Sequence, residues 1–123
     1  MKTVKFLMIV VLIASVTSTL SAQNSVDPTG TWTFKAEQAP YEYNTGDIVI
    51  EKDGNEYTAT IVFGGNYKIK ATDVKYEKNE ISFRVYIEGE SISIKGTVGK
   101  EAIDGTASYS EGTISYKAEK KKQ

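Results

Sequence analysis

The sequence predicts an all-β protein, folded as an eight-stranded antiparallel up-and-down barrel. After Ala22, apolar and polar residues alternate with a period of two along nearly the whole chain, and nothing helical interrupts them. Turn residues recur about every eight to twelve positions, and most linkers are too short for a crossover helix. Consecutive strands are therefore expected to pair as hairpins. A two-sheet sandwich is the alternative, but its longer crossing connections fit these linkers less well.

Residues 1–22 have the pattern of a secretory signal peptide. A short basic start with Lys2 and Lys5 precedes an apolar stretch over residues 6–16, and Ala22 ends a small-residue site. The apolar stretch is shorter than the about twenty residues that a membrane-spanning helix needs. We therefore expect cleavage after Ala22, export to the periplasm or the extracellular space, and no transmembrane segment in the cleaved chain.

The remaining sequence divides into a lead-in at 23–28, a barrel domain at 29–119 and a basic tail at 120–123. About a hundred residues make one domain with a modest core. The chain has no Cys, so the domain must be stable without disulfides, and barrel closure helps because it removes the sheet edges. With 15 basic and 16 acidic residues the net charge is −1, which is unlike a nucleic-acid-binding protein. We expect a monomer.

Each expected strand turns one face toward the barrel interior. The first strand sends Trp32, Phe34 and Ala36 inward. The later inward sets, in chain order, are Ile48 and Ile50; Tyr57, Ala59, Ile61 and Phe63; Tyr67, Ile69 and Ala71; Ile81, Phe83, Val85 and Ile87; Ile92, Ile94 and Gly96; Ile103, Gly105, Ala107 and Tyr109; and Ile114, Tyr116 and Ala118. Residues that tolerate positive φ punctuate them at 53–55, 64–66, 78–79, 88–89, 99–100 and 111–112.

Two places depart from this rhythm. The inward set changes phase between Ala71 and Tyr76, which predicts a bulge or bend near Thr72 and Asp73. The segment 37–46 is longer than the other linkers. It is the candidate lid over one mouth of the barrel.

These residues give the chain a resemblance to the calycin superfamily, which includes lipocalins, fatty-acid-binding proteins and avidins. Its members begin the first strand with Gly-x-Trp, and Gly30-Thr31-Trp32 stands at that position. The stretches at 73–75, 79–83, 94–98 and 103–106 are similar to short bacterial lipocalin-like domains that follow a signal peptide. The resemblance implies that Trp32 crosses the closed end of the barrel, with Lys117 or Lys120 against it. The chain departs from full-length lipocalins, since it lacks their C-terminal helix, and the ligand-contacting residues of avidins cannot be placed.

The sequence has few residues that could carry out enzymatic chemistry. The sequence has no His and no Cys, so the usual general base, the thiolate nucleophile and most transition-metal ligand sets are missing. Paired carboxylates occur only at strand ends and turns, where solvated acids are ordinary, and 53–56 lacks the ligand spacing of a calcium loop. We expect no enzyme, no catalytic or metal-binding residue and no cofactor.

The inward aromatic residues predict a binding function for a small, largely apolar ligand. The small inward residues Ala36, Ala59, Ala71, Gly96, Gly105 and Ala107 leave room beside them, because an eight-stranded barrel is just wide enough for side chains or one small ligand. The predicted ligand contacts are Tyr41, Tyr43, Tyr57, Tyr67, Phe83, Tyr109 and Tyr116, whereas Gly30 and Trp32 are assigned to the fold.

Two other functions stay open. A filled barrel without a pocket would act through its outer surface as an envelope interaction or accessory module, with Arg84, Tyr86, Val62 and Val49 contributing. A glycan binder using exposed Tyr residues is less well supported, because no repeated aromatic platform occurs. An internal cavity larger than a few waters would favour the ligand-binding function over the filled barrel.

Overall fold

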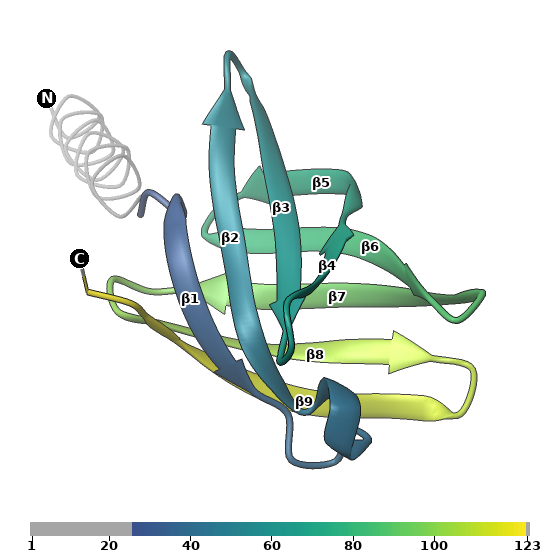
Figure 1. Ribbon diagram of the computed structural model, residues 1–123. Helices are drawn as coiled ribbons and strands as arrows, with labels where there is room; N and C mark the ends of the chain where they lie inside the picture. Colours follow the sequence, from purple (N-terminus) through teal and green to yellow (C-terminus); the bar gives the residue numbers. More distant parts are fainter. Residues whose placement is uncertain (1–25, 123) are drawn as a thin grey trace, which may run out of the picture.

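Antiparallel strands follow one another around a single sheet that curls into a nearly closed barrel (Figure 1). The computed structural model describes residues 26–122, so the expected signal peptide lies outside the described residues. The elements are β1 (Gly30–Lys35), η1, a 3₁₀ helix (Tyr41–Tyr43), β2 (Thr45–Asp53), β3 (Glu56–Phe63), β4 (Tyr67–Lys70), β5 (Thr72–Glu77), β6 (Glu80–Ile87), β7 (Glu90–Val98), β8 (Ala102–Tyr109) and β9 (Gly112–Lys120). In this part of the chain, no helix has the length and apolar character needed to cross a membrane.

The order of strands in the sheet is β4-β3-β2-β1-β9-β8-β7-β6-β5. Every pair is antiparallel. All pairs join strands that are consecutive in the chain, apart from the pair of β1 and β9. There the first and last strands meet, with Trp32 opposite Lys120 and Phe34 opposite Ala118. The expected all-β antiparallel meander is confirmed, and the two-sheet sandwich is excluded.

Residues 26–122 form nine strands rather than the expected eight, because two short strands, β4 and β5, stand where one strand was expected. β4 pairs with β3, β5 pairs with β6, and only Ala71 separates them. Asp73 has a φ of 54°, and the β5–β6 register shifts between Thr72 and Lys75. The expected irregularity near Thr72 and Asp73 is confirmed, and it turns the chain from one neighbour to the other. At the break between β4 and β5, the Ala71 amide donates to the carbonyl of Ala59 on β3 at 2.8 Å.

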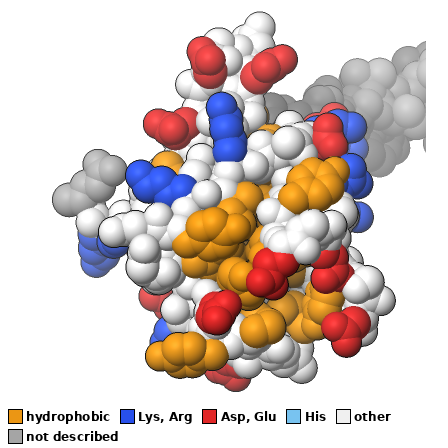
Figure 2. Space-filling view, turned by 45° about the vertical axis from the view of Figure 1, so that its right-hand side comes forward, with side chains coloured by type: hydrophobic (Ala, Val, Ile, Leu, Met, Phe, Trp, Pro, Cys, Tyr) orange, Lys and Arg blue, Asp and Glu red, His pale blue; other side chains and the backbone are white. Residues whose placement is uncertain are grey.

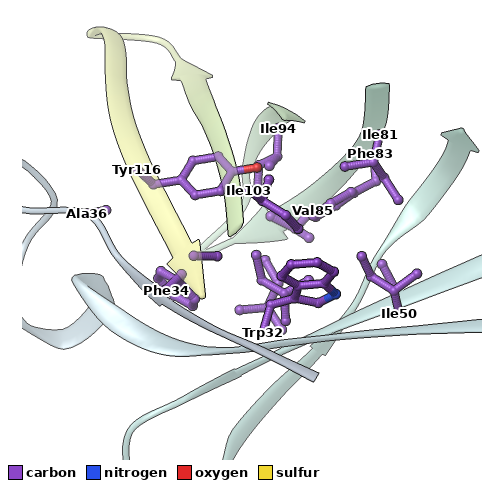
Figure 3. Close-up of a cluster of buried hydrophobic side chains, with 14 of the residues drawn as sticks. Trp32, Phe34, Ala36, Ile50, Ile81, Phe83, Val85, Ile94, Ile103 and Tyr116 are labelled. Carbon is purple, nitrogen blue, oxygen red and sulfur yellow. The ribbon is translucent and has the colours of Figure 1, made fainter. Parts of the chain in front are cut away.

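The alternating residues form one hydrophobic core inside the barrel, as Figure 3 shows for part of it. Trp32, Ile50, Ile81 and Ile103 are fully buried. The other buried members are Phe34, Ala36, Ile48, Ala59, Ile61, Phe63, Phe83, Val85, Ile87, Ile94, Val98, Tyr116 and Ala118. The period of two therefore decides which face of each strand is buried.

Trp32 is buried near one end of the barrel, opposite the last residue of β9. Its side chain is 0% exposed, and its indole Nε1 donates to the Pro28 carbonyl at 3.0 Å. The Lys120 Nζ lies 5.4 Å from the centroid of the indole ring, within the range of a cation–π contact. Gly30 has a φ of 133°, and a Cβ there would lie 3.1 Å from Lys120 Cε, so Gly suits both the backbone and the space. Of the two lysines considered from the sequence, it is Lys120 rather than Lys117 that contacts the ring.

Hydrogen bonds hold the segment before β1 and the segment after β9 at this end of the barrel. The Tyr76 hydroxyl donates to the Val26 carbonyl, and the Val26 amide donates to Asn79 Oδ1 at 2.9 Å. The Lys121 amide donates to the Thr31 carbonyl at 2.8 Å, while Lys121 Nζ lies 3.2 Å from Asp47 Oδ2. Residues 120 and 121, expected in the basic tail, are thus bound to the barrel.

Tyr116 fills space that the sequence appeared to leave free. Gly96 is opposite Gly105 on β7 and β8, and Gly105 is opposite Tyr116 on β9. A Cβ on Gly105 would lie 2.0 Å from the Lys95 carbonyl oxygen and 2.7 Å from the Tyr116 ring, and one on Gly96 would lie 2.6 Å from the Tyr116 hydroxyl. The Tyr116 ring therefore packs directly against the two glycines. The expectation that Gly96 and Gly105 leave room for a ligand is wrong, because Tyr116 occupies this space.

Candidate functional site

The two ends of the barrel differ in what closes them. The connections β2–β3, β5–β6 and β7–β8 and both ends of the described chain lie at the Trp32 end, called here the closed end. The connections β1–β2, β3–β4, β6–β7 and β8–β9 lie at the other end, called here the open end, where η1 sits (Figure 1).

A cavity of about 380 Å³ opens at this second end. One water occupies about 30 Å³ in the liquid, and small-molecule sites commonly measure about 300–1,000 Å³. The cavity therefore has the size of a ligand site. Its lining residues are Phe34, Ala36, Ala39, Pro40, Tyr43, Ile48, Ile61, Phe63, Val85, Ile87, Glu88, Glu90, Ile92, Ile94, Ala107, Tyr109, Glu111, Ile114 and Tyr116. In Figure 2, which brings this side forward, hydrophobic side chains reach the surface with acidic side chains beside them.

The walls are apolar because the inward faces of the strands continue past the core. Ile48, Ile61 and Val85 are core residues that also line the cavity, while Ile92 and Ile114 are half-buried. When a ligand covers apolar surface that is in contact with water, binding is favoured by about 25 cal/mol per Å² of surface covered. The cavity therefore favours hydrocarbon.

The β1–β2 connection forms one side of the mouth. It is held by hydrogen bonds from the Ala36 amide to the Asn44 carbonyl and from the Tyr43 amide to the Pro40 carbonyl, both at 2.8 Å. The Tyr43 ring packs edge-on against Phe63, with 5.0 Å between ring centroids. The candidate lid over 37–46 thus borders the cavity through Ala39, Pro40 and Tyr43.

Tyr116 separates the cavity from the closed end. It belongs to the core and also lines the cavity, and its hydroxyl donates to the Lys95 carbonyl at 3.1 Å. Burial raises the pKa of the Tyr116 phenol well above its usual value, with a smaller contribution from Asp104. The phenol therefore stays neutral at physiological pH. Its hydroxyl proton is donated to the Lys95 carbonyl and is not free to bond a ligand.

Three glutamates, Glu88, Glu90 and Glu111, line the cavity. The Glu90 carboxylate accepts hydrogen bonds from the Ser110 hydroxyl and, at 2.9 Å, from the Ser110 amide. These bonds lower the pKa of Glu90, so this carboxylate is ionised at neutral pH. The pKa of Tyr43 is raised, mainly by desolvation and further by Glu88 and Glu42.

The seven predicted contact residues do not gather in one place. Tyr43, Tyr109 and Tyr116 line the cavity. Tyr41 is 91% exposed and Tyr67 is 48% exposed; neither lines the cavity, although Tyr67 packs near Phe63 with 6.1 Å between ring centroids.

The other two lie deeper in the barrel or toward its closed end. Phe83 is a buried core residue and Tyr57 packs on Tyr76 with 5.5 Å between ring centroids, and neither lines the cavity. The alternation of residues along a strand predicts which aromatic side chains face the barrel interior. The cavity, however, occupies one end of that interior.

The predicted ligand contacts include none of the glutamates or isoleucines that line the cavity, although the isoleucines are expected on the inward faces of the strands. The glutamates were treated as ordinary turn carboxylates, yet Glu90 shares the parity of inward-facing Ile92 and Ile94 on β7. That parity was the available signal. Within residues 26–122, no group of three or more acidic side chains is arranged to hold a metal ion.

No protein-family model matches this chain, and no curated protein matches it with significant similarity. The function of the cavity must therefore be inferred from its own geometry.

Proposed function

We propose that this protein is an exported, lipocalin-like binding protein that holds one small, largely apolar ligand in the open-end cavity. The observation that carries the proposal is an apolar cavity of about 380 Å³ in a barrel whose other end is packed around Trp32. Export is inferred from the pattern of residues 1–22, and the lipocalin-like character from Gly30-Thr31-Trp32 and the antiparallel meander.

The lining residues divide the binding task. Val85 and Ile94 lie on the wall with the other apolar residues, where hydrocarbon replaces water. Tyr43 and Tyr109 bring phenol groups to the same lining, and these groups can accept or donate a hydrogen bond to a polar part of the ligand. The proposal assigns no catalytic role, because the chain has neither His nor Cys.

The filled barrel acting through its outer surface is the alternative. Tyr86 is 54% exposed on the outer face of β6, and Val49 and Val62 are half-buried on the outer faces of β2 and β3. The volume of the cavity supports ligand binding over this alternative, because a filled barrel would hold no more than a few waters.

The experiment fills the cavity and compares the result with a matched substitution elsewhere on the same strand. Ala107 lines the cavity on β8, whereas Ala102 is exposed at the other end of β8. We expect A107F to abolish saturable binding of a neutral apolar fluorescent probe and A102F to leave it within about twofold of the unsubstituted protein. Circular dichroism and thermal unfolding verify that both variants fold. The proposal fails when the folded, unsubstituted protein binds no neutral apolar probe, or when A107F binds as well as A102F.

A further inference from the structure

The connections at the two ends of the barrel differ in charge. Every charged residue in the four connections of the open end is acidic: Glu37 and Glu42 in β1–β2, Glu88 in β6–β7 and Glu111 in β8–β9. Among the strand-end residues beside these connections, Glu90 is the first residue of β7 and Lys35 is the last residue of β1. Within the described residues, neither Lys nor Arg lines the cavity.

The closed end carries charges of both signs, because acidic residues such as Asp53, Glu56 and Glu77 lie at the strand ends beside its lysines. Lys78 lies in the β5–β6 connection, Lys100 and Glu101 lie in the β7–β8 connection, and the chain leaves β9 through Lys121 and Lys122. The acidic character of the mouth is therefore a local feature and does not follow from the net charge of −1.

The cavity glutamates are not neutralised by ion pairs in the described part of the chain. The two ion pairs found there join Arg84 to Asp73 and Lys121 to Asp47, and neither involves a residue that lines the cavity. Glu90 is also held in place by two hydrogen bonds from Ser110. A fixed negative charge thus borders an apolar cavity.

We propose that the ligand is a cationic amphiphile, in which a hydrocarbon body fills the cavity and an ammonium group lies among Glu88, Glu90 and Glu111. This inference rests on the proposed function and specifies its ligand class. The rings of Tyr43 and Tyr109, which line the same cavity, can add cation–π attraction to the ammonium group. A carboxylate head group would instead be repelled at the mouth.

The test uses three ligands that share an octyl chain and differ only in charge: 1-octanol, octylammonium and octanoate. Binding is measured by calorimetry at neutral pH and low salt. We expect octylammonium to bind about tenfold more tightly than 1-octanol and octanoate to bind more weakly than 1-octanol, because several carboxylates act together on one head group. The preference is expected to shrink in 1 M salt, where the screening length falls to about 3 Å.

Two charge-matched variants locate the source of the preference. In E88Q/E111Q, which leaves the Glu90–Ser110 hydrogen bonds intact, the preference for octylammonium over 1-octanol should fall to about threefold or less. Its control, E56Q/E101Q, removes the same charge from the closed end, where Glu56 follows the β2–β3 turn, and should keep the full preference.

The outcomes separate this inference from the proposed function. Equal binding of the three ligands, or tighter binding of octanoate, overturns the cationic ligand and leaves an apolar cavity that binds ligands. An equal loss of preference in both variants overturns the placement of the ammonium group. Failure of all three ligands to bind the folded protein contradicts the proposed function itself.

Discussion

The closed end and the open end of this barrel are built from the same alternating strands but are completed in opposite ways. At the closed end, Trp32 is 0% exposed, is hydrogen-bonded to Pro28 and is contacted by Lys120. At the open end, aliphatic and aromatic side chains together with three glutamates line a cavity of about 380 Å³. One end thus supplies the packing that stabilises the fold, and the other supplies the surface available for binding.

Tyr116 lies at the boundary between the two. Its ring packs on Gly105 and Gly96, and its hydroxyl is bonded to the Lys95 carbonyl. A bulky ring over two glycines closes the floor of the cavity without widening the barrel. Substitutions on the two sides of this residue should therefore behave differently.

The largest expected effect is at Trp32. Replacement by Ala removes a fully buried ring and leaves the Pro28 carbonyl without its indole donor, so we expect W32A to lower the free energy of unfolding by about 3–5 kcal/mol. Chemical denaturation measures this loss. Y41A is the control, because Tyr41 is 91% exposed, and it should change stability by less than about 0.5 kcal/mol. Similar losses in the two variants would contradict the packed closed end.

A pair of isoleucines compares the two ends with the same substitution. Ile103 is fully buried on β8, whereas Ile114 is half-buried on β9 and lines the cavity. We expect I103A to lower the free energy of unfolding by about 2–5 kcal/mol and I114A to cost clearly less, because the Ile114 side chain already faces open space. Chemical denaturation of both variants gives the difference. An I114A loss as large as that of I103A would mean that the open end is packed like a core.

Two glycines make a smaller comparison. A Cβ on Gly105 would meet the Lys95 carbonyl and the Tyr116 ring, whereas a Cβ on Gly64 would have nothing within 4 Å. We expect G105A to destabilise the protein by about 1–3 kcal/mol through overpacking and G64A to be within about 0.5 kcal/mol of the unsubstituted protein. Thermal unfolding of both variants is sufficient. A neutral G105A would show that the Tyr116 ring has room to move.

The smallest effect is a dependence on alkaline pH. Because burial raises the pKa of the Tyr116 phenol in the folded state, its contribution to stability is complete below the unfolded tyrosine pKa of about 10 and is lost as pH rises above it. Y116F removes this ionisation and the hydrogen bond to Lys95, at a cost of about 0.5–1.5 kcal/mol near pH 7. Stability measured from pH 8 to pH 11 should therefore fall less steeply in Y116F. Parallel curves would contradict the assignment of the buried phenol.

Much of the fold could be predicted from the sequence because the period of two is a strong signal. It identified the inward faces, the meander and the break near Thr72 and Asp73. The number of strands was harder to predict. A bulge in one hairpin and a break between β4 and β5 leave the same phase change in the sequence.

The candidate site was less predictable, because alternation tells which face a residue is on but not how far along the barrel it lies. Phe83 and Tyr109 are both inward by parity, yet only Tyr109 lines the cavity. The volume of the cavity also depends on which side chain fills which gap. Gly96 and Gly105 suggested free space in the sequence, but in the folded protein Tyr116 packs over them.

The most direct test of the account is a nuclear magnetic resonance titration of isoleucine methyl groups with 1-octanol. The account predicts saturable shifts, all with one dissociation constant, for Ile87, Ile92, Ile94 and Ile114, which line the cavity, and none beyond background for Ile50, Ile81 and Ile103 in the closed-end core. Shifts that never saturate, or that are as large in the closed-end set as in the cavity set, would contradict a ligand site confined to the open end.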